Sequence, residues 1–226
     1  MRMIYGFGCK NVILSLLFIR PAPSEIDMAD VDLIKSRLTS HPDFPKKGIV
    51  FLDIFPILRE PLVFETLITH LAQHITSHTL GISQTKKIDV IVALDARGFL
   101  LGPIVALRLG AAFVPVRKAG KLPGQCISAS YEKEYGTDSF EMQADAIKPG
   151  QNVVVIDDLL ATGNLVPHEK LTATDSSKGG SAHAAGELVA KQGGKTLEYI
   201  FIIELLFLKG SSKLDAPVYS VIQTDD

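Results

Sequence analysis

Two adjacent carboxylates directly follow an apolar run in the C-terminal half of the sequence. Asp157 and Asp158 come after Val153–Ile156, and the small residues Ala161–Gly163 follow after two leucines. Carboxylates accept hydrogen bonds from hydroxyl groups, and small residues let backbone N–H groups approach an anion, which the start of a following helix also attracts. The stretch therefore predicts a site for a phosphate-bearing ribose, the alternative being an Asp-rich turn that caps a helix.

Basic residues supply two further candidates. Arg97, in Asp95-Ala96-Arg97-Gly98, lies where a strand is expected to meet a helix, and its planar guanidinium can bind a diphosphate or pair with a nearby carboxylate. Arg117, Lys118 and Lys121 form a basic cluster of the kind that a polyanionic substrate would need, although most basic loops are only solvated. The stretch from about 119 to 136 is long, polar and glycine-containing, so we expect it to act as a lid.

The elements that must position these residues alternate between helices and strands. Hydrophobic spacing predicts helices over 31–38, 64–75 and 99–109, and strands over 88–94, 112–116, 153–156, 197–204 and 218–222. This alternation indicates an α/β fold with a parallel sheet and helices on both faces. Such sheets bind ligands at the carboxyl ends of their strands, so the candidate segments should meet at one edge.

Composition excludes several classes of protein. The chain has 226 residues, a net charge of −2 and 46% hydrophobic residues, which favours one domain with a core and argues against a nucleic-acid or anionic-membrane binder. Its two cysteines, Cys9 and Cys126, cannot form a disulfide framework or a paired-Cys zinc site. No apolar run reaches the roughly 18 residues of a membrane span. We therefore expect a cytoplasmic protein.

The stretch 153–163 resembles the phosphoribosyl-pyrophosphate (PRPP) signature of the type I phosphoribosyltransferases. Further motifs narrow the resemblance to the adenine phosphoribosyltransferase family, over residues 28–226. In chain order they are Asp43-Phe44-Pro45, Gly48-Ile49-Val50-Phe51-Leu52-Asp53-Ile54, Asp95-Ala96-Arg97-Gly98-Phe99, Arg117-Lys118-Ala119-Gly120-Lys121-Leu122-Pro123-Gly124 and Ser130-Tyr131-Glu132-Lys133-Glu134-Tyr135-Gly136.

The resemblance implies a type I phosphoribosyltransferase-like fold: a mostly parallel central sheet flanked by helices, with a small hood and a flexible lid loop. It implies that adenine and PRPP become AMP and pyrophosphate, in purine salvage. It further implies that Mg²⁺ is bound through PRPP with no direct protein ligand, and that the protein is a homodimer.

The resemblance also implies residue roles. Glu134 would be the catalytic acid/base and Tyr135 part of the lid, while Val50, Phe51 and Leu52 would hold adenine, mainly through main-chain groups. The residues implied to bind PRPP are Asp157, Asp158, Ala161, Thr162, Gly163, Gly180, Ser181, Arg97, Arg117, Lys118 and Lys121. A strained peptide is implied at Asp95–Ala96. At Leu52 family members often carry a charged residue, so one polar contact to the base should be weaker here.

Two segments depart from the family pattern. Residues 1–27 read as an N-terminal extension outside the fold, either because translation starts at Met28 or because the segment directs targeting. Residues 164–179 separate Gly163 from Gly180 in the phosphate loop, either as a retained intron or as a genuine insertion. Because a phosphate cradle needs contiguous N–H groups, we expect the insertion to impair catalysis.

One alternative function remains at this point. The same fold can serve a non-catalytic regulator that senses PRPP or a nucleotide. A regulator can lose its lid base, whereas Glu134, Lys121 and Tyr135 are all present here. The sequence therefore favours an enzyme whose partners are small molecules, with neither nucleic acid nor membrane among them.

Overall fold

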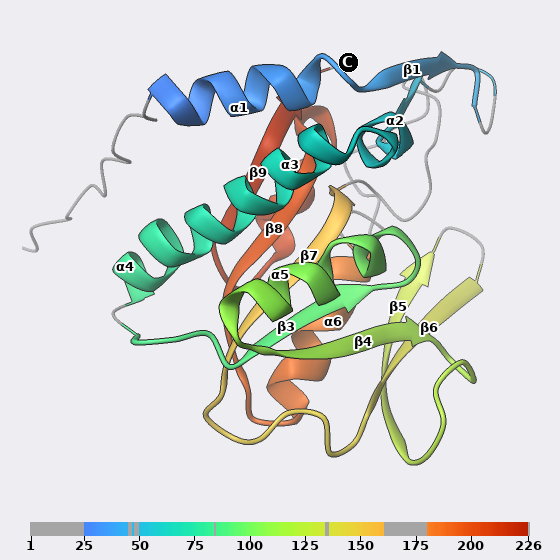
Figure 1. The fold of residues 1–226 in the computed structure, drawn as a ribbon. Helices are drawn as coiled ribbons and strands as arrows, with labels where there is room; N and C mark the ends of the chain where they lie inside the picture. Colours follow the sequence, from blue (N-terminus) through green and yellow to red (C-terminus); the bar gives the residue numbers. More distant parts are fainter. Residues whose placement is uncertain are drawn as a thin grey trace, which may run out of the picture.

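The computed structural model describes residues 25–44, 47, 50–83, 85–133, 136–160 and 180–225, except for the side chains of 25–27 and 131–138. Within this part of the chain, seven strands form one sheet in the order β5-β6-β4-β3-β7-β8-β9 (Figure 1). Its strands are β3 (Val90–Leu94), β4 (Ala112–Lys118), β5 (Cys126–Lys133), β6 (Gly136–Gln143), β7 (Asn152–Leu160), β8 (Lys195–Leu205) and β9 (Val218–Thr224).

Five neighbouring strands of the sheet are parallel, namely β4, β3, β7, β8 and β9. β5 and β6 form an antiparallel hairpin that joins the sheet beside β4. β7 lies between β3 and β8, and its residues Val153–Ile156 are fully buried. The prediction of a central parallel strand is therefore confirmed, because only a strand covered on both faces buries such a continuous apolar run.

Helices cover both faces of the sheet, as predicted. The α-helices of the described residues are α1 (Glu25–Lys35), α2 (Phe55–Arg59), α3 (Pro61–His74), α4 (Leu80–Ser83), α5 (Gly102–Leu109) and α6 (Gly180–Lys191). A π-helix, Ile75–Thr79, joins α3 to α4. In the same described part of the chain, three short 3₁₀-helices span Arg97–Leu100, Leu206–Leu208 and Gly210–Lys213.

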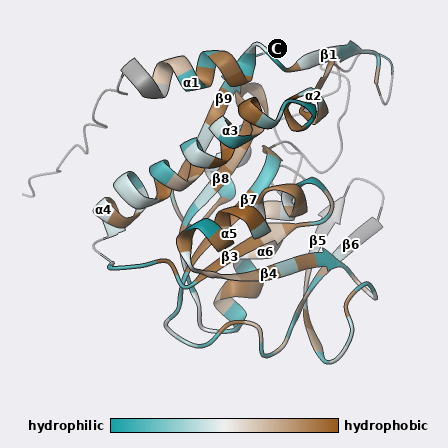
Figure 2. Ribbon diagram, viewed as in Figure 1, coloured by the Kyte–Doolittle hydropathy of each residue, from teal (hydrophilic) through white to brown (hydrophobic). Residues whose placement is uncertain are grey.

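The sheet separates two hydrophobic cores. On β8, Ile200 and Ile202 enter a core shared with α1, α2, α3 and α5, whereas Tyr199 and Phe201 enter a second core shared with α6. This alternation is the period of two that a strand imposes on its side chains. Figure 2 shows the hydrophobic residues concentrated on the central strands and on α5, which packs on β3.

A small hairpin stands apart from the main sheet. β1 (Thr39–Pro42) and β2 (Val50–Asp53) pair antiparallel, with Thr39 opposite Asp53, and form the hood that the resemblance implied (Figure 1). Among the described residues, no helix is both long and apolar enough to cross a membrane.

Three elements differ from the sequence-based expectation. α1 begins at Glu25, three residues before Met28. The helix predicted over 99–109 is a 3₁₀-helix, Arg97–Leu100, followed by α5, whose first turn contains Pro103, a residue typical of helix starts. Part of the stretch expected to be a lid loop, Cys126–Lys133, forms β5, whose backbone groups pair with β6.

Candidate active site

The segments whose residue types pointed to chemistry meet at the carboxyl end of the sheet. Asp95 follows β3, Asp157 and Asp158 lie near the end of β7, and Arg117 lies near the end of β4. Because β3 pairs in parallel with both β4 and β7, these three strand ends lie side by side. The prediction that they share one edge of the sheet is confirmed.

The two adjacent carboxylates lie in different surroundings. The Asp158 N–H donates to Asp157 Oδ1 at 2.9 Å, and the Asp158 side chain forms an ion pair with Arg97. Burial of the Asp157 carboxyl group, followed by the nearby charge of Asp158, raises the pKa of Asp157 well above its usual range. The pair therefore offers one side chain that is engaged by Arg97 and one carboxyl group that tends to hold its proton.

Gly98 allows the 3₁₀-helix Arg97–Leu100 to lie directly against the acidic strand end. A Cβ at Gly98 would lie 3.0 Å from Asp157 Oδ1 and 3.0 Å from the Ile156 carbonyl oxygen. Any larger residue would push on the carboxyl group or on the main chain of β7. This close approach is the structural reason for glycine after Arg97.

Arg97 connects the acid pair to an aromatic cavity. Its Nε donates to Asp158, and its Cζ lies 5.4 Å from the centre of the Phe51 ring, within the range of a cation–π contact. Of the two interpretations of Arg97, the structure contains the carboxylate pair. A guanidinium has five N–H donors, so this pair does not exhaust its capacity to bind a diphosphate.

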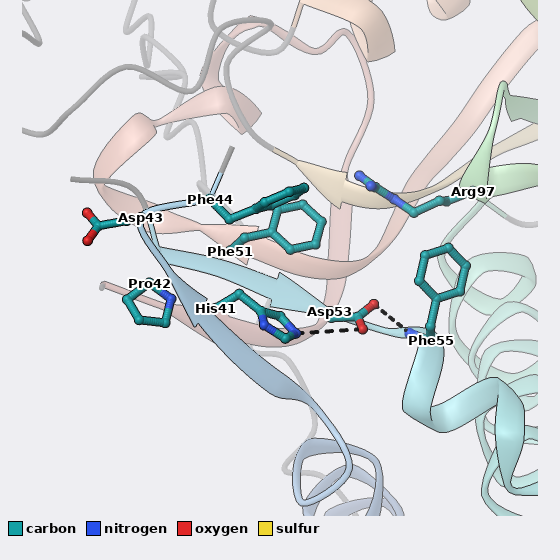
Figure 3. A pocket seen from close by; sticks show the side chains of 8 residues that line it. All are labelled: His41, Pro42, Asp43, Phe44, Phe51, Asp53, Phe55 and Arg97. Atoms are coloured by element: carbon teal, nitrogen blue, oxygen red, sulfur yellow. Dashed lines mark hydrogen bonds and ion pairs between the residues drawn. The ribbon is translucent and has the colours of Figure 1, made fainter. Parts of the chain in front are cut away.

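The cavity beside Arg97 has a volume of about 580 Å³. It is lined by His41, Pro42, Asp43, Phe44, Phe51, Asp53, Phe55 and Arg97 (Figure 3). The Phe44 and Phe51 rings meet edge to face with centroids 5.3 Å apart, and Figure 3 shows the Arg97 side chain reaching toward them. A cavity of aromatic faces with one cation at its edge suits a flat heterocycle.

Strand alternation divides the residues expected to hold adenine. Phe51 faces the cavity, while Leu52 packs against the core of the helices and Val50 is exposed. Val50 and Leu52 do not line the cavity, so their part in holding adenine stays a prediction. The charged side chain that family members often carry at Leu52 would face this core.

One hydrogen bond joins the hood hairpin to α2, and a longer ion-pair contact lies within the hairpin. The Phe55 N–H donates to Asp53 Oδ1 at 2.9 Å, and His41 Nε2 lies 3.9 Å from Asp53 Oδ2 (Figure 3). The sequence analysis did not single out His41 or Phe55. Nothing in their local pattern marks them, because their place at the cavity depends on the pairing of β1 with β2.

The basic cluster lies on the other side of the β3 end. Arg117 Nε donates to Asp95 Oδ2 at 2.8 Å, and its Nη1 donates to the Lys121 carbonyl oxygen at 3.1 Å. Lys118 and Lys121 are exposed. The Asp95–Ala96 peptide bond is cis, at the position where the resemblance implied a strained peptide. Arg117 thus ties the loop after β4 to the end of β3.

Gly180 and Ser181 are the first two residues of α6, a position where unpaired N–H groups favour an anion. The remaining predicted site residues, Glu134, Tyr135, Ala161, Thr162 and Gly163, lie outside the described residues, as does the 164–179 segment.

The chain is similar in sequence and in structure to known proteins. The family described as "Phosphoribosyl transferase domain" matches residues 63–165. A curated adenine phosphoribosyltransferase from Yarrowia lipolytica is 54% identical over 84% of this chain and 93% of its own length. The chain belongs to the adenine phosphoribosyltransferase family. The human adenine phosphoribosyltransferase is 42% identical over 86% of this chain and 97% of its own length.

The crystal structure of the Saccharomyces cerevisiae adenine phosphoribosyltransferase, complexed with an imino-altritol bisphosphate and adenine, shares the fold. It superposes with a TM-score of 0.74 at 47% identity and covers 86% of this chain and 99% of the yeast chain. The predicted family and the predicted fold class are confirmed.

Proposed function

We infer that this chain transfers the 5-phosphoribosyl group from PRPP to adenine, releasing AMP and pyrophosphate, in purine salvage. The observation that carries this inference is the position of Arg97, which contacts both the acid pair and the aromatic cavity. A transferase must hold its two substrates against each other, and Arg97 lies where the two binding regions meet. The family relationship supports the same reaction.

The proposed division of roles follows the chemistry of each region. The Asp157–Asp158 pair accepts the ribose hydroxyl groups, and the start of α6 with residues 161–163 binds the 5′-phosphate. Arg97, Arg117, Lys118 and Lys121 bind the diphosphate, and Phe51 stacks on adenine. The support for these assignments is that each region offers the donors or acceptors that its part of the substrates requires.

In the proposed reaction a ring nitrogen of adenine forms a bond to C1 of the ribose while the bond from C1 to the diphosphate oxygen breaks. The adenine nitrogen must then lose a proton, and Glu134 is proposed to take it under the closed lid. The basic residues stabilise the negative charge that develops on the leaving diphosphate.

We further propose that Mg²⁺ reaches the site on the diphosphate of PRPP. Mg²⁺ favours oxygen ligands and keeps several waters, so it commonly binds to substrate phosphates. Asp158 is engaged by Arg97, and the raised pKa of Asp157 favours its neutral form. These residues therefore fit an ion that the substrate carries, whose charge would offset that of the diphosphate.

We propose that the chain forms a homodimer, on the ground of exposed leucines, and that it is cytoplasmic, on the ground of its cysteine content. Leu62 of α3 and Leu107 of α5 are 83% and 81% exposed, on helices joined by the Arg108–Glu65 ion pair. Large exposed apolar side chains on neighbouring helices favour contact with another chain. The composition, with two cysteines and no disulfide framework, suits a reducing compartment.

The reaction is tested by incubating the full chain with labelled adenine, PRPP and Mg²⁺ and following labelled AMP and pyrophosphate. We expect AMP that depends on PRPP, and no comparable product from guanine. Asp158→Ala should raise the KM for PRPP sharply while far-UV circular dichroism stays unchanged. PRPP binding without turnover, with Glu134 intact, would instead support the regulator.

The phosphate loop carries a separate proposal, that residues 164–179 interrupt the cradle. Its support is that the phosphoribosyl transferase domain match ends at residue 165, two residues after Gly163. Deleting 164–179 should join Gly163 to the start of α6 and lower the KM for PRPP, because the N–H groups become contiguous. The comparison is a side-by-side assay of both forms, and equal KM values would contradict the interruption.

A further inference from the structure

Two histidines and a glutamate form a cluster that the transferase reaction does not use. His74 ends α3, His78 lies four residues later in the π-helix, and Glu198 lies near the start of β8. Their nearest nitrogen and oxygen atoms all lie within 4.8 Å of one another. The Glu198 side chain is 3% exposed, that of His74 10% and that of His78 20%.

The cluster is separate from the candidate active site. Glu198 pairs with Val154 in the first half of β7, whereas Asp157, farther along β7, pairs with Phe201. Three residues along a strand correspond to about 10 Å. None of the three cluster residues lines the aromatic cavity. Glu198 lies on the face of β8 that is covered by α3, alongside Ile200 and Ile202.

The two nitrogen–oxygen distances in the cluster bracket the ligand spacing of a zinc site. His74 Nε2 lies 3.0 Å from Glu198 Oε2, and His78 Nδ1 lies 3.8 Å from Glu198 Oε1. In a tetrahedral zinc site with bonds of about 2.0–2.1 Å, the ligand atoms are about 3.3 Å apart. We propose that His74, His78 and Glu198 bind one Zn²⁺ ion, with a water molecule as the fourth ligand.

Neighbouring residues orient the ligands as the outer groups of metal sites do. The Tyr219 ring stacks on the His74 ring with centroids 3.5 Å apart and planes within 12°. Thr79 Oγ1 donates to Glu198 Oε2 at 2.5 Å, while His78 stacks on His74 with centroids 4.7 Å apart. A site whose ligands are held in place loses less freedom when the ion binds.

The ligand set selects the class of ion. Two imidazole nitrogens and one carboxylate suit Zn²⁺ and other late divalent transition metals, whereas Mg²⁺ and Ca²⁺ favour oxygen ligands. The proposed Zn²⁺ site is therefore distinct from the place where Mg²⁺ is proposed to bind, on the diphosphate of PRPP. Because the ligands come from α3, the π-helix and β8, a bound ion would clamp these helices to the sheet and stabilise the folded chain.

The test uses the full chain after metal removal with EDTA and dialysis. Titration with Co²⁺ should produce a visible absorption band that saturates at one ion per chain, and added Zn²⁺ should abolish it. An excess of Mg²⁺ should leave the band unchanged. Zn²⁺ should also raise the melting temperature. Absence of a saturable band, or its loss with Mg²⁺, would overturn the proposal.

Two variants test which residues bind the ion. His78→Gln changes the most exposed ligand and should weaken Co²⁺ binding at least about tenfold. His183→Gln, on the exposed side of α6, is the matched control and should bind as the unchanged chain does. Equal binding in the two variants would refute the site. If His74, His78 and Glu198 only bridge the helix to the sheet through hydrogen bonds, none of the forms will bind Co²⁺ stoichiometrically.

Discussion

Gly98→Ala tests whether the close packing of the acidic strand end matters for PRPP. The added Cβ would lie 3.0 Å from Asp157 Oδ1 and from the Ile156 carbonyl oxygen, whereas ordinary contacts begin at 3.4 Å. The neighbours must therefore yield by about 0.4 Å, the difference of these two distances. The Ile156 main chain is paired with both β3 and β8, so the Asp157 carboxyl group should be the part that moves.

Two magnitudes follow from that displacement. Overpacking in a buried region costs about 1–3 kcal/mol of unfolding free energy, which lowers the Tm of a chain of this size by roughly 2–12 °C. Since a shift of about 1 Å in a positioning group costs about 100-fold in rate, 0.4 Å should lower kcat/KM for PRPP about 3- to 10-fold. The KM for adenine should change less, because Asp157 does not line the aromatic cavity.

Scanning calorimetry and initial-rate kinetics with each substrate varied in turn provide the measurements. Gly81→Ala is the matched control, because nothing lies within 4 Å of a Cβ at that position in α4. Its Tm should stay the same or rise slightly, and its kinetics should not change. A Gly98→Ala variant with a lowered Tm but unchanged kcat/KM for PRPP would refute the assignment of Asp157 to substrate binding.

Three further predictions concern single side chains. Burial raises the pKa of Asp157, so the stabilising contribution of its carboxyl group is complete below the unfolded-state pKa of about 3.9 and is lost as the pH rises toward the folded-state pKa. In urea titrations, Asp157→Asn should therefore gain unfolding free energy relative to the parent as the pH rises above about 4, and a difference that stays constant with pH would contradict this. Phe51→Ala should raise the KM for adenine roughly 5- to 150-fold, from about 1–3 kcal/mol of lost stacking, while Phe51→Tyr stays near the parent value in the same assay. Glu134→Gln should lower kcat by about 10²–10⁴-fold without weakening PRPP binding, and Glu132→Gln in the same stretch is the control, so equal kcat values in the two variants would remove Glu134 from the proton transfer.

The strands that carry the site were predictable because their signal is local. An apolar run such as Val153–Ile156 is stable only when it is covered on both faces, so it had to become a central parallel strand. The rule that parallel strands present ligand sites at their carboxyl ends then placed Asp157 and Asp95 at one edge without any coordinates.

The exact ends of helices and the nature of the lid stretch were less predictable. The stretch 119–136 is polar and contains glycine, which indicated a loop, yet β5 forms there because β6 supplies pairing partners for its backbone. Likewise, Gly102 at the start of α5 lies so close to β3 that an added Cβ would be 2.7 Å from the Ala93 Cβ, a contact that the sequence around Gly102 does not indicate. In both cases the contact is made with another element of the fold, so the hydrophobic pattern of the segment itself does not indicate it.

The amino-acid sequence alone is enough to give the family, the order of the five parallel strands along the chain, and the residue types available at their ends. Which of those residues touch was decided by the tertiary structure. Arg97 pairs with Asp158 across 61 residues, and His74 reaches Glu198 across 124. Such pairs depend on the register of parallel strands and on the helix that covers each face. No local periodicity carries that information, because each contact is made by elements that are distant along the chain.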